Sequence, residues 1–398
     1  FQDDDLWGYI ANNQEINFGF NTRIQNHIDW ISTQPDYLAS ISKRAEPFLY
    51  LVVSETERPG VPIELALLPI VESDYYPFSY SQGTATGLWQ FIPSTGRMYG
   101  LDADWWHEDR RDVLASTKAA IRYLKDLNKM FDGDWLLSIA AYNAGPGRVQ
   151  RAIDKNLELG RKIDYWSLDL PKETKKYVPK LLAIGSVLKD PALYNQKLTK
   201  IENKPFLEAV QLDSQFDLAL IAQWTDLSIN EIYSYNPGLK RWATPEVLPY
   251  TILLPQEAVF EFNDNLSEQS NRPKISWMRY QVKEGDTLSL IAQNYKTTVD
   301  QIKSVNELNN NLIRLDSYLI VPLAKESEEY YSLSEAQREK SRLNTNKNSG
   351  KVIYEVVSGD SLWKIALNYG VTVNDLVRWN QIVPADPLSI GKKLVILN

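Results

Sequence analysis

The stretch Leu65–Pro93 reads LALLPIVESDYYPFSYSQGTATGLWQFIP, and it places one acid, Glu72, between an apolar run and a polar, glycine-rich segment. The residues before Glu72 are too apolar for a solvated helix and too few for a membrane span, which predicts a buried core helix. Pro62 suits the first position of that helix. We expect Ser73–Pro77 to end it, because the residue before a proline is pushed out of the α region. Glu72 then lies in the last turn.

This position predicts that Glu72 holds its proton near neutral pH. A carboxylate in the last turn faces the negative end of the helix dipole, and apolar neighbours such as Leu68 disfavour its charged form. Both effects raise the pKa of Glu72. The sequence therefore predicts a general acid.

Two blocks of residues carry a family resemblance. The first contains Glu72-Ser73, Pro77, Ser81, Gly83, Gly87-Leu88-Trp89-Gln90 and Pro93-Ser94-Thr95-Gly96, and the second is Ala140-Ala141-Tyr142-Asn143-Ala144-Gly145. In this order they resemble the catalytic domain of the soluble lytic transglycosylase and goose-type lysozyme superfamily. The resemblance implies an all-α, lysozyme-like domain, and we place it at residues 1–195.

Apolar periodicity agrees with a helical domain. Residues 1–58 have the spacing of helices that wrap a core, and Asp112–Phe131 has one apolar face, which is typical of an amphipathic helix. Gly133-Asp134 predicts a break and a helix N-cap, followed by a helix that ends near Asn143. Tyr177–Leu188 reads as the last helix of the domain, and no strand alternation is evident before it.

Two later segments repeat one another. Tyr280–Pro322 and Tyr354–Leu397 share Tyr-x-Val, Gly-Asp-Thr/Ser-Leu, Ile-Ala, Asn-Tyr and Thr-Val in the same order. They resemble LysM modules, small α+β units of βααβ order that bind glycans containing N-acetylglucosamine. We place the modules at residues 278–323 and 352–398, and we expect residues 324–351 to form a solvated, partly helical linker.

A third and weaker copy lies at Leu207–Pro255. It keeps the order of extended run, two helices and extended run but lacks the Gly-Asp-Thr-Leu turn. We interpret residues 205–256 as a degenerate module that packs on the catalytic domain.

The Gly-Asp turns are the expected sugar contacts of the two complete modules. Their candidate binding residues are Gly285, Asp286, Thr287, Gly359, Asp360 and Ser361. We expect the backbone there to touch the sugar, while Asp286 and Asp360 cap the helices that follow them.

The number of catalytic carboxylates distinguishes the possible mechanisms of glycoside cleavage. A glycosidase usually needs two, roughly 5 to 9.5 Å apart. Glu64 is about 12 Å from Glu72 along one helix, too far to act as its partner. Asp74 is closer but follows the helix end, where a carboxylate more often caps the chain or faces solvent. The residues favour a single-acid mechanism.

The resemblance implies such a mechanism. Glu72 protonates the glycosidic oxygen between N-acetylmuramic acid and N-acetylglucosamine, then acts as base on the C6 hydroxyl of the same muramic residue. A 1,6-anhydro ring closes and no water is consumed. Ser81, Gln90, Tyr142 and Asn143 are carried over as substrate-binding or orienting residues. The alternatives are a hydrolytic muramidase, in which Asp74 or another carboxylate activates water, and a non-catalytic peptidoglycan-binding protein.

The two histidines carry less signal. His27 lacks a second ligand at metal-binding spacing, and we expect a surface or capping residue. His107 follows Trp105-Trp106, and the wall of a groove and a core position are equally good interpretations. Since metal spacings and nucleotide fingerprints are missing from the sequence, no metal or organic cofactor is expected.

Composition limits the partners and the location. A formal charge of -8 and a pI near 5.1 argue against nucleic-acid binding, unless the totals hide a local basic face. No window resembles a transmembrane span, there are no cysteines, and the start at Phe1 is typical of a mature or trimmed form. The resemblance implies a bacterial envelope enzyme in the periplasm that binds peptidoglycan strands. In lipid-anchored members it is attached to the outer membrane, and any anchor would lie upstream of Phe1. We expect a monomer.

Overall fold

The structure, a computed structural model, describes residues 4–57, 60–81, 84–269, 274–347, 351–356 and 392–397, with single positions between 362 and 380. Gly83, Gly359, Asp360 and Ser361 lie outside the described residues. The chain divides into two compact units, residues 1–331 and 332–398. Within the described part, no helix is sufficiently long and apolar to cross a membrane.

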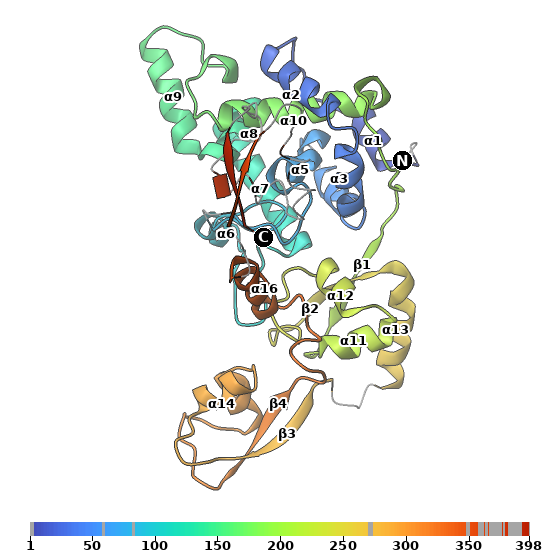
Figure 1. The fold of residues 1–398 in the computed structure, drawn as a ribbon, viewed down its shortest axis with the longest axis vertical. Coiled ribbons are helices and arrows are strands. Elements are labelled where there is room, and N and C mark those ends of the chain that lie inside the picture. Colours follow the sequence, from blue (N-terminus) through green and yellow to red (C-terminus); the bar gives the residue numbers. More distant parts are fainter. Residues whose placement is uncertain are drawn as a thin grey trace. The chain divides into compact units, whose positions relative to one another are not determined.

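The first part of unit one is helical, as expected (Figure 1). The described residues before position 207 form no β-strand and contain only isolated β-bridges. The α-helices are α1 (Leu6–Asn12), α2 (Thr22–Ser32), α3 (Tyr37–Ala45), α4 (Leu49–Thr56), α5 (Leu68–Ser73), α6 (Pro93–Met98), α7 (Val113–Met130), α8 (Trp135–Ala144), α9 (Pro146–Glu158) and α10 (Thr174–Lys189). Short 3-10 turns are η1 (Ile63–Leu67), η2 (Tyr165–Ser167) and η3 (Ala192–Tyr194).

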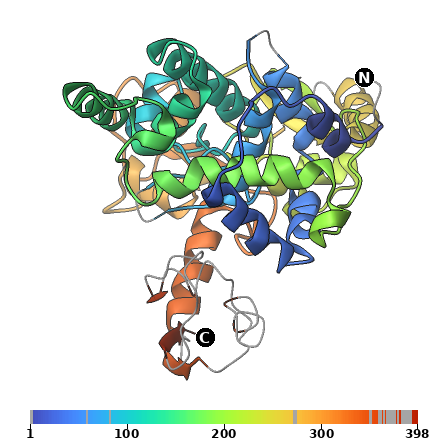
Figure 2. The same cartoon turned by 90° about the horizontal axis from the view of Figure 1, so that it is seen from above.

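Helix α10 is the central element of this part. It packs against α1, α2, α5, α8 and η1, and Figure 2 shows it lengthwise across the helical domain. Both its faces carry fully buried apolar residues, including Val178, Leu181, Ile184 and Val187. Burying each of these side chains contributes about 1.5–3 kcal/mol. The helix therefore fixes the position of every side chain that it presents to α5 and α8.

Two predicted helix starts are confirmed. The Asp112 side chain accepts the Ala115 N–H at the start of α7, and the Asp134 side chain accepts the Leu137 N–H at the start of α8. A side chain that accepts such an orphan N–H stabilises a helix by about 1 kcal/mol. Helix α8 then ends at Ala144, which leaves Tyr142 and Asn143 in its last turn, as predicted.

The helix that carries Glu72 differs from the prediction in two respects. Pro62 is not its first residue, because Pro62 has extended backbone angles and a 3-10 turn, η1, precedes the α-helix. The chain leaves the helix at Asp74 and Tyr75, whose φ values of 49° and 59° are left-handed, rather than because of Pro77. The buried Tyr75 side chain fixes this turn by donating to the Ala66 carbonyl at 2.8 Å. Glu72 still lies in the last turn.

A second part of unit one has the βααβ order expected for residues 207–255. It comprises β1 (Leu207–Leu212), α11 (Leu218–Thr225), α12 (Ile229–Tyr235) and β2 (Tyr250–Pro255), with β1 and β2 antiparallel and Leu207 opposite Pro255. Helix α13 (Gln256–Glu268) follows and packs on α11. We call residues 207–268 the βααβα region.

The first complete module has the same order. Strands β3 (Ser276–Gln281) and β4 (Tyr318–Leu323) pair antiparallel, and α14 (Leu288–Asn294) and α15 (Val299–Val305) lie between them in sequence. Apolar residues at the predicted repeat positions, including Leu288, Ile291 and Val321, form a separate core.

Unit two is described only in part. Helix α16 (Glu335–Lys347) precedes the antiparallel strands β5 (Lys351–Glu355) and β6 (Lys393–Leu397). Leu362, Ile365, Leu376 and Ile396 are buried together, as the repeat predicts.

The expected solvated linker is only partly solvated, which corrects the prediction. Tyr331 is buried and donates its hydroxyl to Asp217 Oδ1 at 2.8 Å, while the Lys325 N–H donates to Asp217 Oδ2 at 2.7 Å. A buried carboxylate needs such donors. These two hydrogen bonds hold the segment Lys325–Tyr331 on the βααβα region.

Replacing Tyr331 with phenylalanine tests this attachment. Tyr331→Phe removes a hydrogen bond to a charged, buried acceptor, so the free energy of local opening of residues 325–331 falls by about 2 kcal/mol. Hydrogen exchange of this segment measures it. The exposed neighbour provides the control, since Tyr330→Phe leaves exchange unchanged. Equal effects of the two substitutions would contradict the attachment.

Candidate active site

Glu72 meets a tyrosine from a distant part of the chain. The Tyr177 hydroxyl donates a short hydrogen bond to Glu72 Oε1, although 105 residues separate them. Tyr177 lies in the first turns of α10, and burial followed by the charge of Glu72 raises its pKa well above the ordinary value. Tyr177 therefore stays a donor and fixes Oε1, which leaves Oε2 to carry a proton.

The surroundings raise the pKa of Glu72 to about 7, from an ordinary value of 4.5. Burial of the carboxyl group is the largest cause, and the negative charge of Glu173 adds to it. The Tyr177 hydrogen bond and the positive charge of Lys180 act in the opposite direction. The residue as a whole is half-buried, while its carboxyl group is the buried part. Near neutral pH a substantial fraction of Glu72 is thus protonated.

A tight loop carries two of the predicted binding residues. We call residues 79–81 and 84–91 the site loop. Gln90 has a left-handed φ of 48°, and its Nε2 donates to the carbonyls of Gly87 at 2.8 Å and Ser79 at 3.3 Å. These bonds use the amide nitrogen of Gln90 and leave Oε1 as an acceptor for a ligand. A strained backbone of this kind is common at functional sites.

Ser81 and Tyr142 also belong to this loop or support it. Ser81 Oγ accepts the Ala85 N–H at 3.2 Å, so its hydroxyl hydrogen can be donated elsewhere. The Tyr142 hydroxyl donates to the Trp89 carbonyl at 2.8 Å, directly before Gln90. Ser73, next to the acid, donates to the Leu88 carbonyl at 2.9 Å. The acid-bearing helix, α8 and the site loop are therefore joined by direct bonds.

Asn143 is bonded at both ends of its amide. Its Nδ2 donates to Glu173 Oε1 at 3.2 Å, and its Oδ1 accepts the Thr174 hydroxyl at 2.8 Å. These bonds join the end of α8 to the start of α10. Asn143 thus holds Glu173, whose charge acts on Glu72.

The two nearby carboxylates considered in the sequence have other partners. Asp74 accepts a hydrogen bond from the Tyr37 hydroxyl at 3.3 Å, and its backbone carbonyl accepts one from Arg44 at 2.6 Å. Glu64 is buried and accepts the Ile16 N–H at 2.6 Å, on the N-terminal segment. Both carboxylates hold the fold together around the acid.

Sequence reasoning missed Tyr177 and Glu173. They are four residues apart on one face of α10, a pairing visible in Glu173-Thr174-Lys175-Lys176-Tyr177. Nothing local connects that segment to Glu72, because only the packing of α10 on α5 brings them together. The start of the predicted last helix was also placed too late, at Tyr177 instead of Thr174.

The two histidines lie in different surroundings. His27 is half-buried rather than a surface residue, and burial followed by the charges of Lys180 and Lys176 lowers its pKa to about 4. His107 is buried, its Nδ1 lies 2.9 Å from Asp109, and its ring packs edge-on to Tyr250 of the βααβα region. The core interpretation of His107 is therefore correct. Among the described residues, no three acidic or histidine side chains converge as metal ligands would.

The turn of the first complete module differs from the expected capping pattern. Thr287, and not Asp286, caps α14, with its side chain accepting the Leu290 N–H at 3.1 Å. Asp286 instead accepts the Lys283 N–H at 2.7 Å and the Tyr280 hydroxyl at 2.8 Å. Gly285 takes a left-handed φ of 83°, which favours glycine in this tight turn. Asp286 therefore shapes the turn in place of capping the helix.

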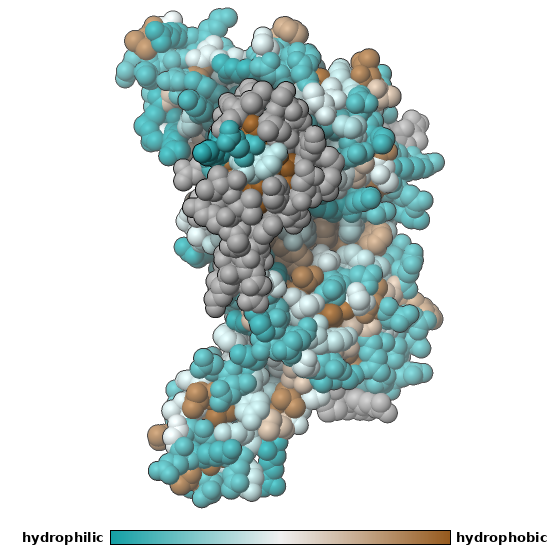
Figure 3. Space-filling model, in the orientation of Figure 1, coloured by the Kyte–Doolittle hydropathy of each residue, from teal (hydrophilic) through white to brown (hydrophobic). Residues whose placement is uncertain are grey.

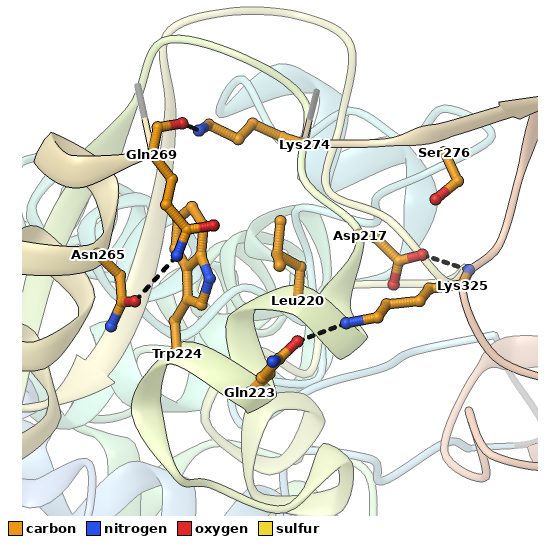
Figure 4. A pocket seen from close by; sticks show the side chains of 9 residues that line it. All are labelled: Asp217, Leu220, Gln223, Trp224, Asn265, Gln269, Lys274, Ser276 and Lys325. Atoms are coloured by element: carbon orange, nitrogen blue, oxygen red, sulfur yellow. Dashed lines mark hydrogen bonds between the residues drawn. The ribbon is translucent and has the colours of Figure 1, made fainter. Parts of the chain in front are cut away.

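A pocket of about 400 Å³ lies in the βααβα region (Figure 4). Its polar groups are bonded to one another: Lys325 Nζ donates to Gln223, the Lys325 N–H donates to Asp217, and Lys274 lies 5.0 Å from the face of Trp224. These contacts join α11 to the segments that follow it. The pocket lacks the acid and the site loop, which lie in the helical part.

The comparisons with known proteins agree with this arrangement. The Transglycosylase SLT domain matches residues 52–164, which include Glu72 and the site loop. The LysM domain matches residues 280–322 and 354–397, and the lytic transglycosylase MltD LysM-like domain matches residues 206–271. The weaker third copy at Leu207–Pro255 thus lies within a match to a LysM-like domain.

Individual relatives extend the match to the whole chain. Membrane-bound lytic murein transglycosylase D of Escherichia coli K12 is 35% identical over 406 residues, covering 98% of this chain and 86% of the relative. The autolysin of Enterococcus faecalis is 37% identical over 29% of this chain and 15% of its own length. The solved structure of the soluble lytic transglycosylase Slt70 from Escherichia coli is 22% identical over 46% of this chain and 29% of that chain, with a TM-score of 0.29. Because the first of these relatives aligns with 98% of this chain at 35% identity, the chain belongs to the membrane-bound lytic murein transglycosylase D family.

Proposed function

We propose that Glu72 is the only acid–base group this chain uses to cleave the bond between N-acetylmuramic acid and N-acetylglucosamine in peptidoglycan. Protonated Glu72 donates from Oε2 to the glycosidic oxygen, which departs with the N-acetylglucosamine end. The 2-acetamido group of the muramic residue stabilises the positive charge at C1. The Glu72 carboxylate then takes the proton of the C6 hydroxyl as that oxygen bonds to C1. The product is a 1,6-anhydromuramic end, and Glu72 regains its proton.

A single observation carries this proposal: burial raises the pKa of Glu72 to about 7. A general acid works best when its pKa lies near the working pH, because it can then donate and take back a proton. The C6 hydroxyl belongs to the same sugar, so proximity replaces a positioned water. No base for water is then needed. Ser81 and Gln90 offer a hydroxyl donor and an amide acceptor from the site loop to orient that sugar.

The LysM modules hold the enzyme on the glycan. LysM domains bind peptidoglycan glycan, and we propose Gly285, Asp286 and Thr287 as contacts in the first module, with Gly359, Asp360 and Ser361 as their counterparts outside the described residues. Figure 3 shows apolar side chains interrupting the hydrophilic surface of the first module. Leu290, three residues past the turn, is 42% exposed, as is expected of a residue that packs against a sugar face.

The likeness to membrane-bound lytic murein transglycosylase D supports a wider proposal. We propose that the chain acts as a monomer in the periplasm of a bacterial envelope, attached to the outer membrane through a lipid anchor upstream of Phe1. We also propose domain limits of 1–195, 205–256, 278–323 and 352–398, with residues 324–351 as the connection.

Substitution of the acid tests the mechanism. Glu72→Gln keeps the size of the side chain but cannot donate a proton as an acid, so turnover of peptidoglycan falls by roughly 10²–10⁴-fold. Asp74→Asn is the matched control, because Asp74 contacts Tyr37, and it retains turnover. Mass spectrometry of the products separates the mechanisms: the proposal predicts anhydromuramic ends. Reducing muramic ends, or full activity of Glu72→Gln, would refute it.

The pH dependence tests the surroundings of the acid. Activity falls as pH rises through about 7, because Glu72 must be protonated to act. Glu173→Gln removes a charge that raises the pKa of Glu72, so this alkaline limb moves to lower pH. Tyr177→Phe removes a hydrogen bond that lowers the pKa, so the limb moves to higher pH. If the alkaline limb of the kcat profile moved in the same direction along the pH axis in both variants, Glu72 would not be the group that sets it.

A further inference from the structure

One arginine holds the site loop at two points, Thr84 and Phe91. Arg110 NH1 donates to the Thr84 carbonyl at 2.9 Å and to the Phe91 carbonyl at 3.2 Å. Thr84 follows Ser81 closely and Phe91 directly follows Gln90. A hydrogen bond from a charged donor is stronger than one between neutral groups. The two carbonyls are therefore held at one point, which fixes the part of the loop between them.

Arg110 is itself held in a rigid fork. Its Nε and NH2 donate to the two carboxylate oxygens of Glu108 at 2.9 Å and 2.8 Å, and only 13% and 12% of the two side chains are exposed. A planar guanidinium paired in this bidentate way has little freedom to rotate. Glu108 thus determines where NH1 of Arg110 points.

Glycines let the surrounding backbone approach Arg110 closely. A Cβ on Gly87, in the site loop, would lie 2.1 Å from the Arg110 carbonyl oxygen. A Cβ on Gly96, in α6, would lie 2.9 Å from Arg110 Cδ. The loop and α6 are therefore packed directly around this residue, and a shift of Arg110 is transmitted to both.

The LysM-like domain fixes Glu108 from the other side. The Glu108 N–H donates to the Gly238 carbonyl at 2.9 Å, and the Lys240 N–H donates to the Trp106 carbonyl at 2.8 Å. Between them, His107 and Leu239 form an antiparallel bridge. Gly238 lies against the His107 ring, since a Cβ there would lie 2.3 Å from His107 Nε2. A strand-like contact thus continues from the LysM-like domain to the backbone of Glu108.

Aromatic side chains strengthen the same contact. Trp106 packs edge-on to Trp242 at 5.6 Å and donates its Nε1 to Glu246 at 2.7 Å, while the Arg241 guanidinium lies 4.1 Å from the Trp105 ring centre. Trp106 and Trp242 are buried, and buried tryptophan contacts of this kind dominate the energy of many interfaces. The Glu108 backbone is therefore held by a well-packed interface.

From these contacts we propose that Arg110 is a positioning residue for glycan cleavage, and that the LysM-like domain supports the active site through Gly238 and Glu108. The domain lacks the Gly-Asp-Thr-Leu turn of the sugar-binding modules. Its segment Gly238–Lys240 holds the backbone of Glu108 in place instead of binding glycan. This inference rests on the proposed contact of the substrate with Ser81 and Gln90. It makes the site loop, and through it substrate binding, dependent on a second domain.

Substitution of Arg110 in the full chain tests the first half of the proposal. Arg110→Ala frees the Thr84 and Phe91 carbonyls, so KM for soluble glycan strands rises about tenfold while kcat changes less than about twofold. Arg110→Lys keeps a charged donor but cannot form the fork to Glu108, so KM returns only part of the way to the wild-type value. The alkaline limb of the pH profile stays in place, since Glu72 is not touched. Arg122→Ala, which loses one bond to the Tyr99 carbonyl, is the matched control and keeps KM unchanged.

Substitution of Gly238 tests the role of the LysM-like domain without changing any residue of the helical domain. Gly238→Ala forces its docked turn away from His107, so KM rises as in Arg110→Ala and hydrogen exchange of peptides from residues 84–91 becomes about tenfold faster in both variants. Gly8→Ala, where a Cβ meets nothing closer than 3.8 Å, is the control.

Two results would overturn the inference. One is a lower melting temperature with unchanged KM and unchanged loop exchange in Arg110→Ala, which would make Arg110 a stabilising residue only. The other is a wild-type loop and KM in Gly238→Ala, which would remove the role of the LysM-like domain. Activity of Glu72→Gln would instead refute the proposed mechanism, and these loop measurements do not depend on that result.

Discussion

The burial of one carboxyl group under a tyrosine hydroxyl is the interaction on which the rest of the structure depends. Glu72 lies at the end of a short apolar helix, and Tyr177 reaches it from α10. Burial and the charge of Glu173 favour the protonated form, while Tyr177 and Lys180 favour the charged form. Because their net result is a pKa of about 7, the group can both donate and accept a proton near neutral pH. The packing of α10 on α5 brings Tyr177 to this contact.

Support for the loop that faces this acid comes from outside the helical domain. Arg110 fixes the loop, Glu108 fixes Arg110, and the LysM-like domain fixes Glu108. The Arg110–Glu108 pair is largely removed from solvent, where a misplaced partner is costly, while the bond from Arg110 to the Thr84 carbonyl is exposed. The proposal gives this LysM-like domain, which lacks the Gly-Asp-Thr-Leu turn, a role in positioning the active site of its neighbour.

Local signals in the sequence predicted much of this structure. The last-turn position of Glu72, the helix starting near Asp112, the N-cap Asp134 and the βααβ repeats all follow from residues close together in the chain. The contacts of Tyr177, Glu173 and Arg110 could not be predicted, because they join segments far apart in sequence and arise only from tertiary packing. The errors have similar causes. Thr287 caps α14 because the backbone turns one residue after Asp286, and Tyr331 is buried because Asp217 needs its hydroxyl.

The account requires that Glu72 titrate far from an ordinary glutamate. Carbon-13 NMR of side-chain carboxyl groups, with the Glu72→Gln variant to assign the signal, measures this directly. The account predicts one glutamate signal with a midpoint at about pH 7 that disappears in the variant. A Glu72 signal with a midpoint near the ordinary value of 4.5 would contradict it.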